Sequence, residues 1–81
     1  MIVRVKLFAV AKELAGQDEL SLELPAGATI ADLRQAAIAK VPALAKIIPH
    51  SVWALDATYA ADRTSIDEKS EIALIPPVSG G

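Results

Sequence analysis

The sequence predicts an α+β fold in which one mixed sheet of about four to five strands packs on one main helix. Two stretches near the start alternate apolar and polar residues, one amphipathic stretch lies in the middle, and a short apolar stretch precedes the end. With 81 residues, the chain has the size of one domain with a modest core. We therefore expect a domain over residues 1–75 and an extended tail over residues 76–81.

The first two strands are predicted from an alternation with a period of two. In IVRVKLF, residues 2–8, Val3, Val5 and Leu7 alternate with charged residues, and in LSLEL, residues 20–24, three leucines alternate with polar residues. Between them AVAKELAG, residues 9–16, is rich in helix formers and stops at a glycine, as a short helical segment does. Two strands joined in this way are expected to form an antiparallel pair.

The main helix is predicted over residues 29–41. Thr29 stands where a helix N-cap is needed, and Asp32 follows three residues later, near the positive end of the helix dipole. Pro42 should end the helix. The residues spaced for one buried face are Ile30, Leu33, Ala37 and Val41.

The rest of the chain supplies the other half of the sheet. Residues 42–49 are expected to be a loop or irregular turn, SVWALDATYA a strand and a turn, DRTSIDEKS a connection, and EIALI a final strand. The order strand, strand, helix, strand, strand is that of the ubiquitin-like β-grasp arrangement. There the first and last strands lie parallel and adjacent at the centre of the sheet, linked by a crossover that carries the helix.

The side-chain alternation of these strands predicts what lies on the face away from the helix. If Val3 faces the helix, Phe8 lies on the open face, and if Leu74 faces the helix, Ile75 lies on that open face too. Phe8 and Ile75 would then form an apolar docking patch beside the tail. The alternative is that Phe8 folds under the first short helix as part of the core. The open face would also carry Ile2, Arg4, Lys6 and Ala73; Arg4 and Lys6 are most simply solvated, although they flank the patch and are available to acids on a partner.

Composition excludes several classes of function. The chain has no cysteine and one histidine, so a disulfide, a thiol nucleophile and a metal site are not expected. A net charge of -2 and a pI near 5.2 argue against nucleic acid as a partner. The opening MIVRVKLF is too short and too charged for a signal peptide or membrane span, and we expect a cytoplasmic protein with no stably bound cofactor.

The tail IPPVSGG is the segment with the clearest chemical potential. Pro76 and Pro77 cannot continue a sheet ladder and should hold the chain extended and directed outward. After the spacer residues Val78 and Ser79, a pair of glycines follows that has no side chains and can pass through a narrow channel. The tail can therefore deliver a terminal carboxylate into the site of another protein. The alternative is a terminus without function.

A carboxylate at the end of this tail needs activation before it can react. Conversion to a mixed anhydride, such as an acyl adenylate, makes the carbonyl carbon electrophilic. The chain has no phosphate-cradling glycine loop of its own, so an ATP-using partner must supply this step. Replacement of one carboxylate oxygen by sulfur would then give a thiocarboxylate, a soft nucleophile.

The whole chain resembles the MoaD-type sulfur carrier family, the small subunits of molybdopterin synthase. The resemblance is carried by the first strand ending in Phe8, by AKELAG and TIADLRQ, and above all by the terminal IPPVSGG. It implies that Gly81 is adenylated with ATP by a ubiquitin-activating-like adenylyltransferase, and that a sulfur donor then converts it to a thiocarboxylate. Gly80 is the thread that enters the active site of the large subunit.

The resemblance further implies a heterotetramer of two small and two large subunits, in which sulfur is delivered to cyclic pyranopterin monophosphate for molybdenum cofactor biosynthesis. The small subunit donates sulfur without being the catalyst, because the active site lies mainly in the large subunit. Family members place contacts to their partners at positions that here are Phe8, Leu74, Ile75, Pro76, Pro77, Val78 and Ser79.

The chain departs from the family pattern at three places. Asp56 stands in the third strand where many members have asparagine, Lys69-Ser70-Glu71 stands where glycine and aspartate often precede the glutamate, and Lys12 stands where arginine is common. The first two departures concern turn geometry and the third concerns a charged contact. The tail itself follows the family pattern.

Three other functions fit the same sequence. A sulfur carrier for another pathway, such as the thiazole of thiamin, also ends in Gly-Gly but usually lacks PPVSGG. A ubiquitin-like modifier would have Gly81 joined to lysines of other proteins. An interaction module with an inert tail would keep its function when Gly80 and Gly81 are deleted.

Overall fold

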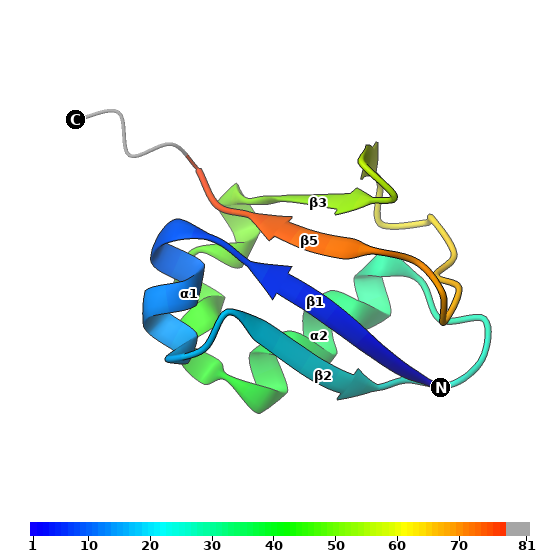
Figure 1. Cartoon of the computed structure of the whole chain (residues 1–81), viewed down its shortest axis with the longest axis horizontal. Helices are drawn as coiled ribbons and strands as arrows, with labels where there is room; N and C mark the ends of the chain where they lie inside the picture. Colours follow the sequence, from blue (N-terminus) through cyan, green and yellow to red (C-terminus); the bar gives the residue numbers. More distant parts are fainter. Residues whose placement is uncertain (78–81) are drawn as a thin grey trace.

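The sheet has five strands in the order β2-β1-β5-β3-β4, in a computed structural model that describes residues 1–77. One longer helix and one short helix complete the α+β fold, as Figure 1 shows. The elements are β1 (Ile2–Leu7), α1 (Ala9–Ala15), β2 (Glu19–Glu23), α2 (Ile30–Lys40), β3 (Val52–Leu55), β4 (Thr58–Ala60) and β5 (Ile72–Ile75), with short 3₁₀ helices η1 (Pro42–Lys46) and η2 (Ile48–His50).

The centre of the sheet is the parallel pair of β1 and β5, which confirms the arrangement expected from the sequence. β2 pairs antiparallel with β1, and β3 pairs antiparallel with β5 and with β4. A parallel pair requires a crossover, and the chain provides it through α2 and the two 3₁₀ helices. The side-chain alternation is also confirmed, since Val3, Val5 and Leu7 are buried between exposed neighbours.

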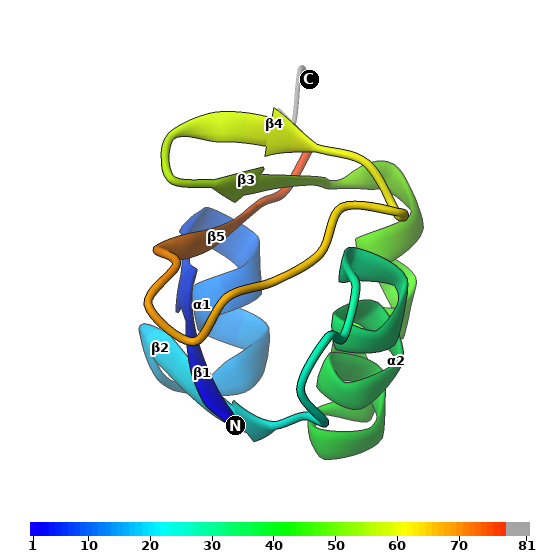
Figure 2. The ribbon, with the colours of Figure 1, turned by 90° about the vertical axis from the view of Figure 1, so that its right-hand side faces the viewer.

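Helix α2 covers one face of the sheet and leaves the opposite face open (Figure 2). Its inward residues Ile30, Leu33 and Ala37 are buried against the inward side chains of the strands, and Val41 is half-buried at the helix end. The helix begins after Thr29 and ends at Lys40, just before Val41 and Pro42, as expected. In residues 1–77 no helix combines the length and apolar character that crossing a membrane requires.

The start of α2 is fixed by two sets of contacts. Thr29 and Asp32 form a capping box, in which each side chain accepts a hydrogen bond from the other residue's backbone N–H. The connection between β4 and β5 then supplies two carbonyl oxygens: Asp62 accepts from the N–H of Ala31 at 3.1 Å, and Thr64 accepts from that of Ile30 at 3.0 Å. The free amides of the first turn are thereby satisfied, and the connection is tied to the helix.

The segment 42–49 differs from the loop that we expected. It forms η1 and η2 because Leu44 and Ile48 are buried in the core and the backbone must coil to turn both of them inward. Proline at the start of each helix is compatible with that coil, because the first residues of a helix have no amide partner to lose.

Two turns explain departures from the family pattern. Asp56 lies in the turn between β3 and β4 rather than in a strand, with φ 50, and Ala57 follows with φ 65. The backbone of Asp56 donates to the Glu71 carbonyl at 2.8 Å, while its side chain accepts from the Glu71 N–H at 2.9 Å. In the second turn, the Asp67 side chain accepts from the N–H of Lys69 at 2.8 Å, so this turn is closed without glycine.

Candidate functional site

The open face of the sheet carries a group of apolar side chains at the end where β1 and β5 finish. We call it the open-face patch. Strand register places its members side by side, because Val52 pairs with Ile75, and Ala54 pairs with both Ala73 and Tyr59. Phe8 completes the group at the end of β1. The open-face patch consists of Phe8, Val52, Ala54, Tyr59, Ala73 and Ile75.

Phe8 lies on this face because of how β1 passes into α1. It is the N-cap residue of α1 with an extended backbone, and the next residue, Ala9, has φ 51 and turns the chain away from the sheet. The side chain that α1 buries is that of Ala11, at 0% exposure. Phe8 is 48% exposed, so the alternative that it folds under α1 as core is wrong.

The open-face patch is hollowed at its centre. A shallow hollow of about 380 Å³ is lined mainly by Phe8, Ala54, Tyr59, Ala73 and Ile75. Lys6 and Glu71 line the same hollow and provide its charged groups. Tyr59 is 77% exposed and Val52 45%, so the patch presents more large apolar surface than Phe8 alone. Contiguous apolar surface of this kind marks protein interaction sites.

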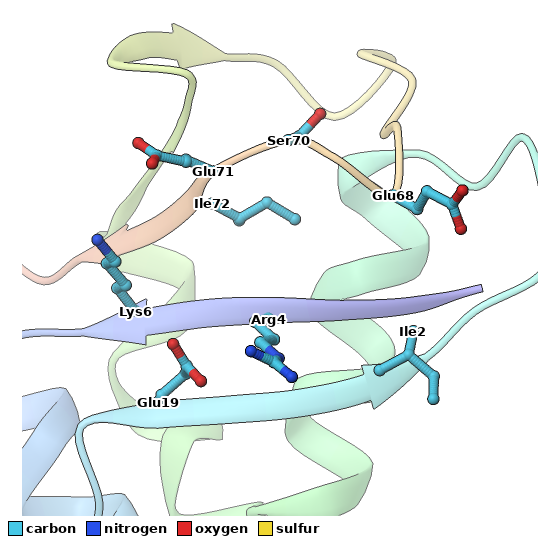
Figure 3. A pocket seen from close by; sticks show the side chains of 8 residues that line it. All are labelled: Ile2, Arg4, Lys6, Glu19, Glu68, Ser70, Glu71 and Ile72. Carbon is cyan, nitrogen blue, oxygen red and sulfur yellow. The ribbon is translucent and has the colours of Figure 1, made fainter.

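The other half of the open face is charged, as Figure 3 shows. Arg4 and Lys6 project from β1, with Glu19 on β2 and Glu71 just before β5. The one side-chain ion pair among residues 1–77 joins Arg34 to Asp62, so both basic groups of β1 are left to solvent. This agrees with the interpretation of Arg4 and Lys6 as a solvated face. Within the same range, no group of three or more metal-binding side chains is placed to hold an ion.

The chain leaves the sheet at the end of β5 (Figure 1), which is the end that carries the open-face patch. β5 ends at Ile75, which is half-buried, and the chain continues through Pro76 and Pro77. Pro77 is exposed, whereas Pro76 is buried. The tail predicted to start at Pro76 therefore keeps its first residue packed on the domain, and its exposed part begins at Pro77.

Apart from Pro76 and Pro77, the predicted site residues fall into three groups in the structure. Phe8 and Ile75 lie together on the open face, as predicted. Leu74 is 0% exposed and pairs with Trp53 on the helix side of the sheet, so its assignment as a surface contact is wrong. The alternation of β5 explains the correction, because residues on either side of Ile75 must face the core. Val78, Ser79, Gly80 and Gly81 lie outside the described residues.

Three members of the patch were missed by the sequence reasoning. Val52 and Ala54 flank the buried Trp53, but the strand sequence VWAL is apolar throughout and shows no alternation that separates its two faces. Nothing local in the sequence shows that β3 lies beside β5 either. Tyr59 joins the patch only because the hairpin of β3 and β4 returns along the same face.

Comparisons with known proteins agree with this fold. The model of the ThiS family matches residues 5–81. The molybdopterin synthase sulfur carrier subunit of Arabidopsis thaliana is 37% identical, over 98% of this chain and 82% of the relative. The molybdopterin synthase sulfur carrier subunit of Caenorhabditis briggsae is 41% identical, over 98% of this chain and 96% of the relative. Among solved structures, SAMP1 from Haloferax volcanii, a small archaeal modifier protein, covers 100% of both chains with a TM-score of 0.89 and 29% identity.

Proposed function

Because the chain belongs to the ThiS family, we propose that it is the sulfur carrier subunit of a molybdopterin synthase. One observation supports this proposal above the others: the chain leaves β5 at the same end of the sheet as the open-face patch. A partner that covers the patch is thereby placed next to the tail. The names of the curated relatives support the same function.

The chemistry that we propose takes place on the carboxylate of Gly81. In a ubiquitin-activating-like enzyme, this carboxylate attacks the α-phosphorus of ATP, pyrophosphate leaves, and an acyl adenylate forms. A donor of sulfur at the oxidation level of sulfide then adds to the acyl carbon and expels AMP. The product is a thiocarboxylate, and Gly80 is the slim segment that lets it enter a partner's site.

In the large subunit, the sulfur of the thiocarboxylate bonds to a carbon of cyclic pyranopterin monophosphate and displaces an oxygen substituent. Water then cleaves the acyl–sulfur bond, which leaves the sulfur on the pterin and returns Gly81 as a carboxylate. Two such transfers supply the two sulfur atoms of the dithiolene in molybdopterin. This chain contributes the sulfur, the tail and the docking face, and the large subunit contributes the acids and bases. We place the reaction in the cytoplasm, in a heterotetramer with the large subunit.

Docking through the open-face patch would be favoured by the burial of apolar surface that is exposed in the isolated chain. Phe8, Val52 and Tyr59 remain between 45% and 77% exposed in the isolated chain, and covering them would release water from a contiguous apolar surface. The charged groups on the same face would orient the partner more than they would bind it. Both the activating enzyme and the large subunit need the tail, so we propose that each covers this patch in turn.

Reconstitution tests the proposal directly. The chain is incubated with the activating enzyme, ATP, a sulfide-level donor, the large subunit and cyclic pyranopterin monophosphate, and molybdopterin is measured. We expect product with the intact chain and none after deletion of Gly80 and Gly81. The matched control is Ala45→Gly, a change on the exposed side of η1, which should leave the yield unchanged. Full yield from the deletion variant would refute the carrier role.

A second candidate function is protein modification. It is favoured by the similarity to SAMP1, at 29% identity over both whole chains. In that case the activated Gly81 is attacked by the amine of a lysine, AMP leaves, and an isopeptide bond forms. Affinity purification of the chain from its host followed by peptide mass spectrometry distinguishes the two functions. Lysines of other proteins that carry the tryptic remnant of residues 70–81, which follows Lys69, would support modification, and a thiocarboxylate without such remnants would support sulfur transfer alone.

A further inference from the structure

The two prolines of the tail occupy different environments. Along β5, Ile72 and Leu74 are 1% and 0% exposed, Ala73 and Ile75 are half-buried, and Pro76 is buried again. Successive residues of an extended chain point to opposite sides. Pro76 therefore continues the inward row of β5 beyond the end of the strand, while Pro77 is exposed.

Both neighbours of β5 leave the sheet at the level of Pro76. The last residue pair with β1 is Leu7 with Leu74, and the last with β3 is Val52 with Ile75. Beyond these pairs, β1 turns into α1 through Ala9, and η2 precedes β3. A proline inside a central strand would remove a ladder hydrogen bond. Position 76 lies just past the last pairs, so a proline ring can be buried there without that cost.

We infer that Pro76 is the positioning residue of the tail, and that its burial fixes where the tail starts and in which direction it leaves. This inference rests on the proposed function of Gly81. From Pro77 to Gly81 there are five residues, which span at most about 17–18 Å when fully extended. With so short a reach, the starting point of the tail decides whether the carboxylate meets the reacting atom.

Anchoring acts on the chemical step more than on binding. The open-face patch provides the docking surface, and Pro76 is buried beside it rather than exposed on it. Alignment of two reacting groups contributes large factors to rate, and a displacement of about 1 Å can cost about 100-fold. A loosened tail should therefore lower kcat while KM stays close to that of the unaltered chain.

The test is the exchange of labelled pyrophosphate into ATP, catalysed by the activating enzyme and measured against the concentration of the full chain. This reaction reports adenylation of Gly81 alone. For Pro76→Ala, which removes the buried ring, we expect kcat about 10-fold lower and KM within about 2-fold. Pro76→Val restores a buried aliphatic group that favours extended backbone, and kcat should stay within about 3-fold. Pro25→Ala, which removes an exposed proline ring in the connection from β2 to α2, is the matched control and should also stay within about 3-fold.

The outcomes separate anchoring from stability and from the proposed function. Partial unfolding of Pro76→Ala would lower the concentration of competent carrier and raise the apparent KM, leaving kcat unchanged. The inference is overturned if KM alone changes, if Pro76→Ala and Pro25→Ala slow exchange equally, or if Pro76→Val is as slow as Pro76→Ala. If the intact chain supports no exchange, or if exchange persists without Gly80 and Gly81, the proposed function itself fails.

Discussion

Replacing Phe8 by alanine should weaken docking of the large subunit far more than it affects folding. Phe8 is 48% exposed, and a phenylalanine side chain offers about 200 Å², so docking can cover about 95 Å² of it. At about 25 cal/mol per Å², that burial contributes about 2.4 kcal/mol, which corresponds to about 50-fold in Kd. Folding should lose only about 1 kcal/mol, because half of the ring is already in water.

The matched control for Phe8→Ala lies on the same strand. Ile2 is 64% exposed and shares the open face, but it stands at the opposite end of β1, among the charged residues. Ile2→Ala should change Kd by less than about 2-fold. Kd is measured by isothermal titration calorimetry against the large subunit, and folding is checked by urea denaturation. Equal Kd values for the two variants would refute the assignment of the open-face patch as the docking surface.

Three further predictions concern stability, each measured as the free energy of unfolding in urea. Leu74→Ala should lower it by about 3–5 kcal/mol, because Leu74 is fully buried. A loss under about 1 kcal/mol would contradict the burial of Leu74 in the core. Thr29→Ala should cost about 1 kcal/mol through loss of the capping box, while Thr29→Ser should cost a few tenths; equal losses would count against a capping role. Ala57→Gly should raise the free energy of unfolding by about 0.5–1 kcal/mol, because glycine adopts φ 65 without strain. Ala39→Gly, on the exposed side of α2, should lower it by about as much. A change of the same sign in both variants would contradict strain at Ala57.

The sequence was sufficient for the elements whose rules are local. The alternation around Val5 fixes which side chains face the helix, because the period of a strand is two. Thr29 and Pro42 mark the ends of α2 by hydrogen-bonding rules that act within a few residues. The same alternation correctly predicted that Phe8 and Ile75 would meet on the open face.

The remaining features depend on contacts between distant segments. The coiling of residues 42–49 follows from the need to bury Leu44 and Ile48 against a core that other segments form. Tyr59 joins the open-face patch because β3 lies beside β5, and Pro76 is buried because it continues a row that β5 begins. Leu74 was assigned to the surface by family resemblance although its own alternation placed it inside, and the alternation was correct.

The most direct test of the carrier function is mass spectrometry of the C-terminal peptide after treatment with a thiol-alkylating reagent. The chain has no cysteine, so an alkylated sulfur at Gly81 can come only from a thiocarboxylate. In the intact chain, alkylation is needed because the exchange of oxygen for sulfur nearly matches in mass the oxidation of Met1, whereas the C-terminal peptide contains no methionine. After incubation with the activating enzyme, ATP and a sulfide-level donor, we predict an alkylated Gly81. A terminus that stays unmodified under these conditions would contradict the account.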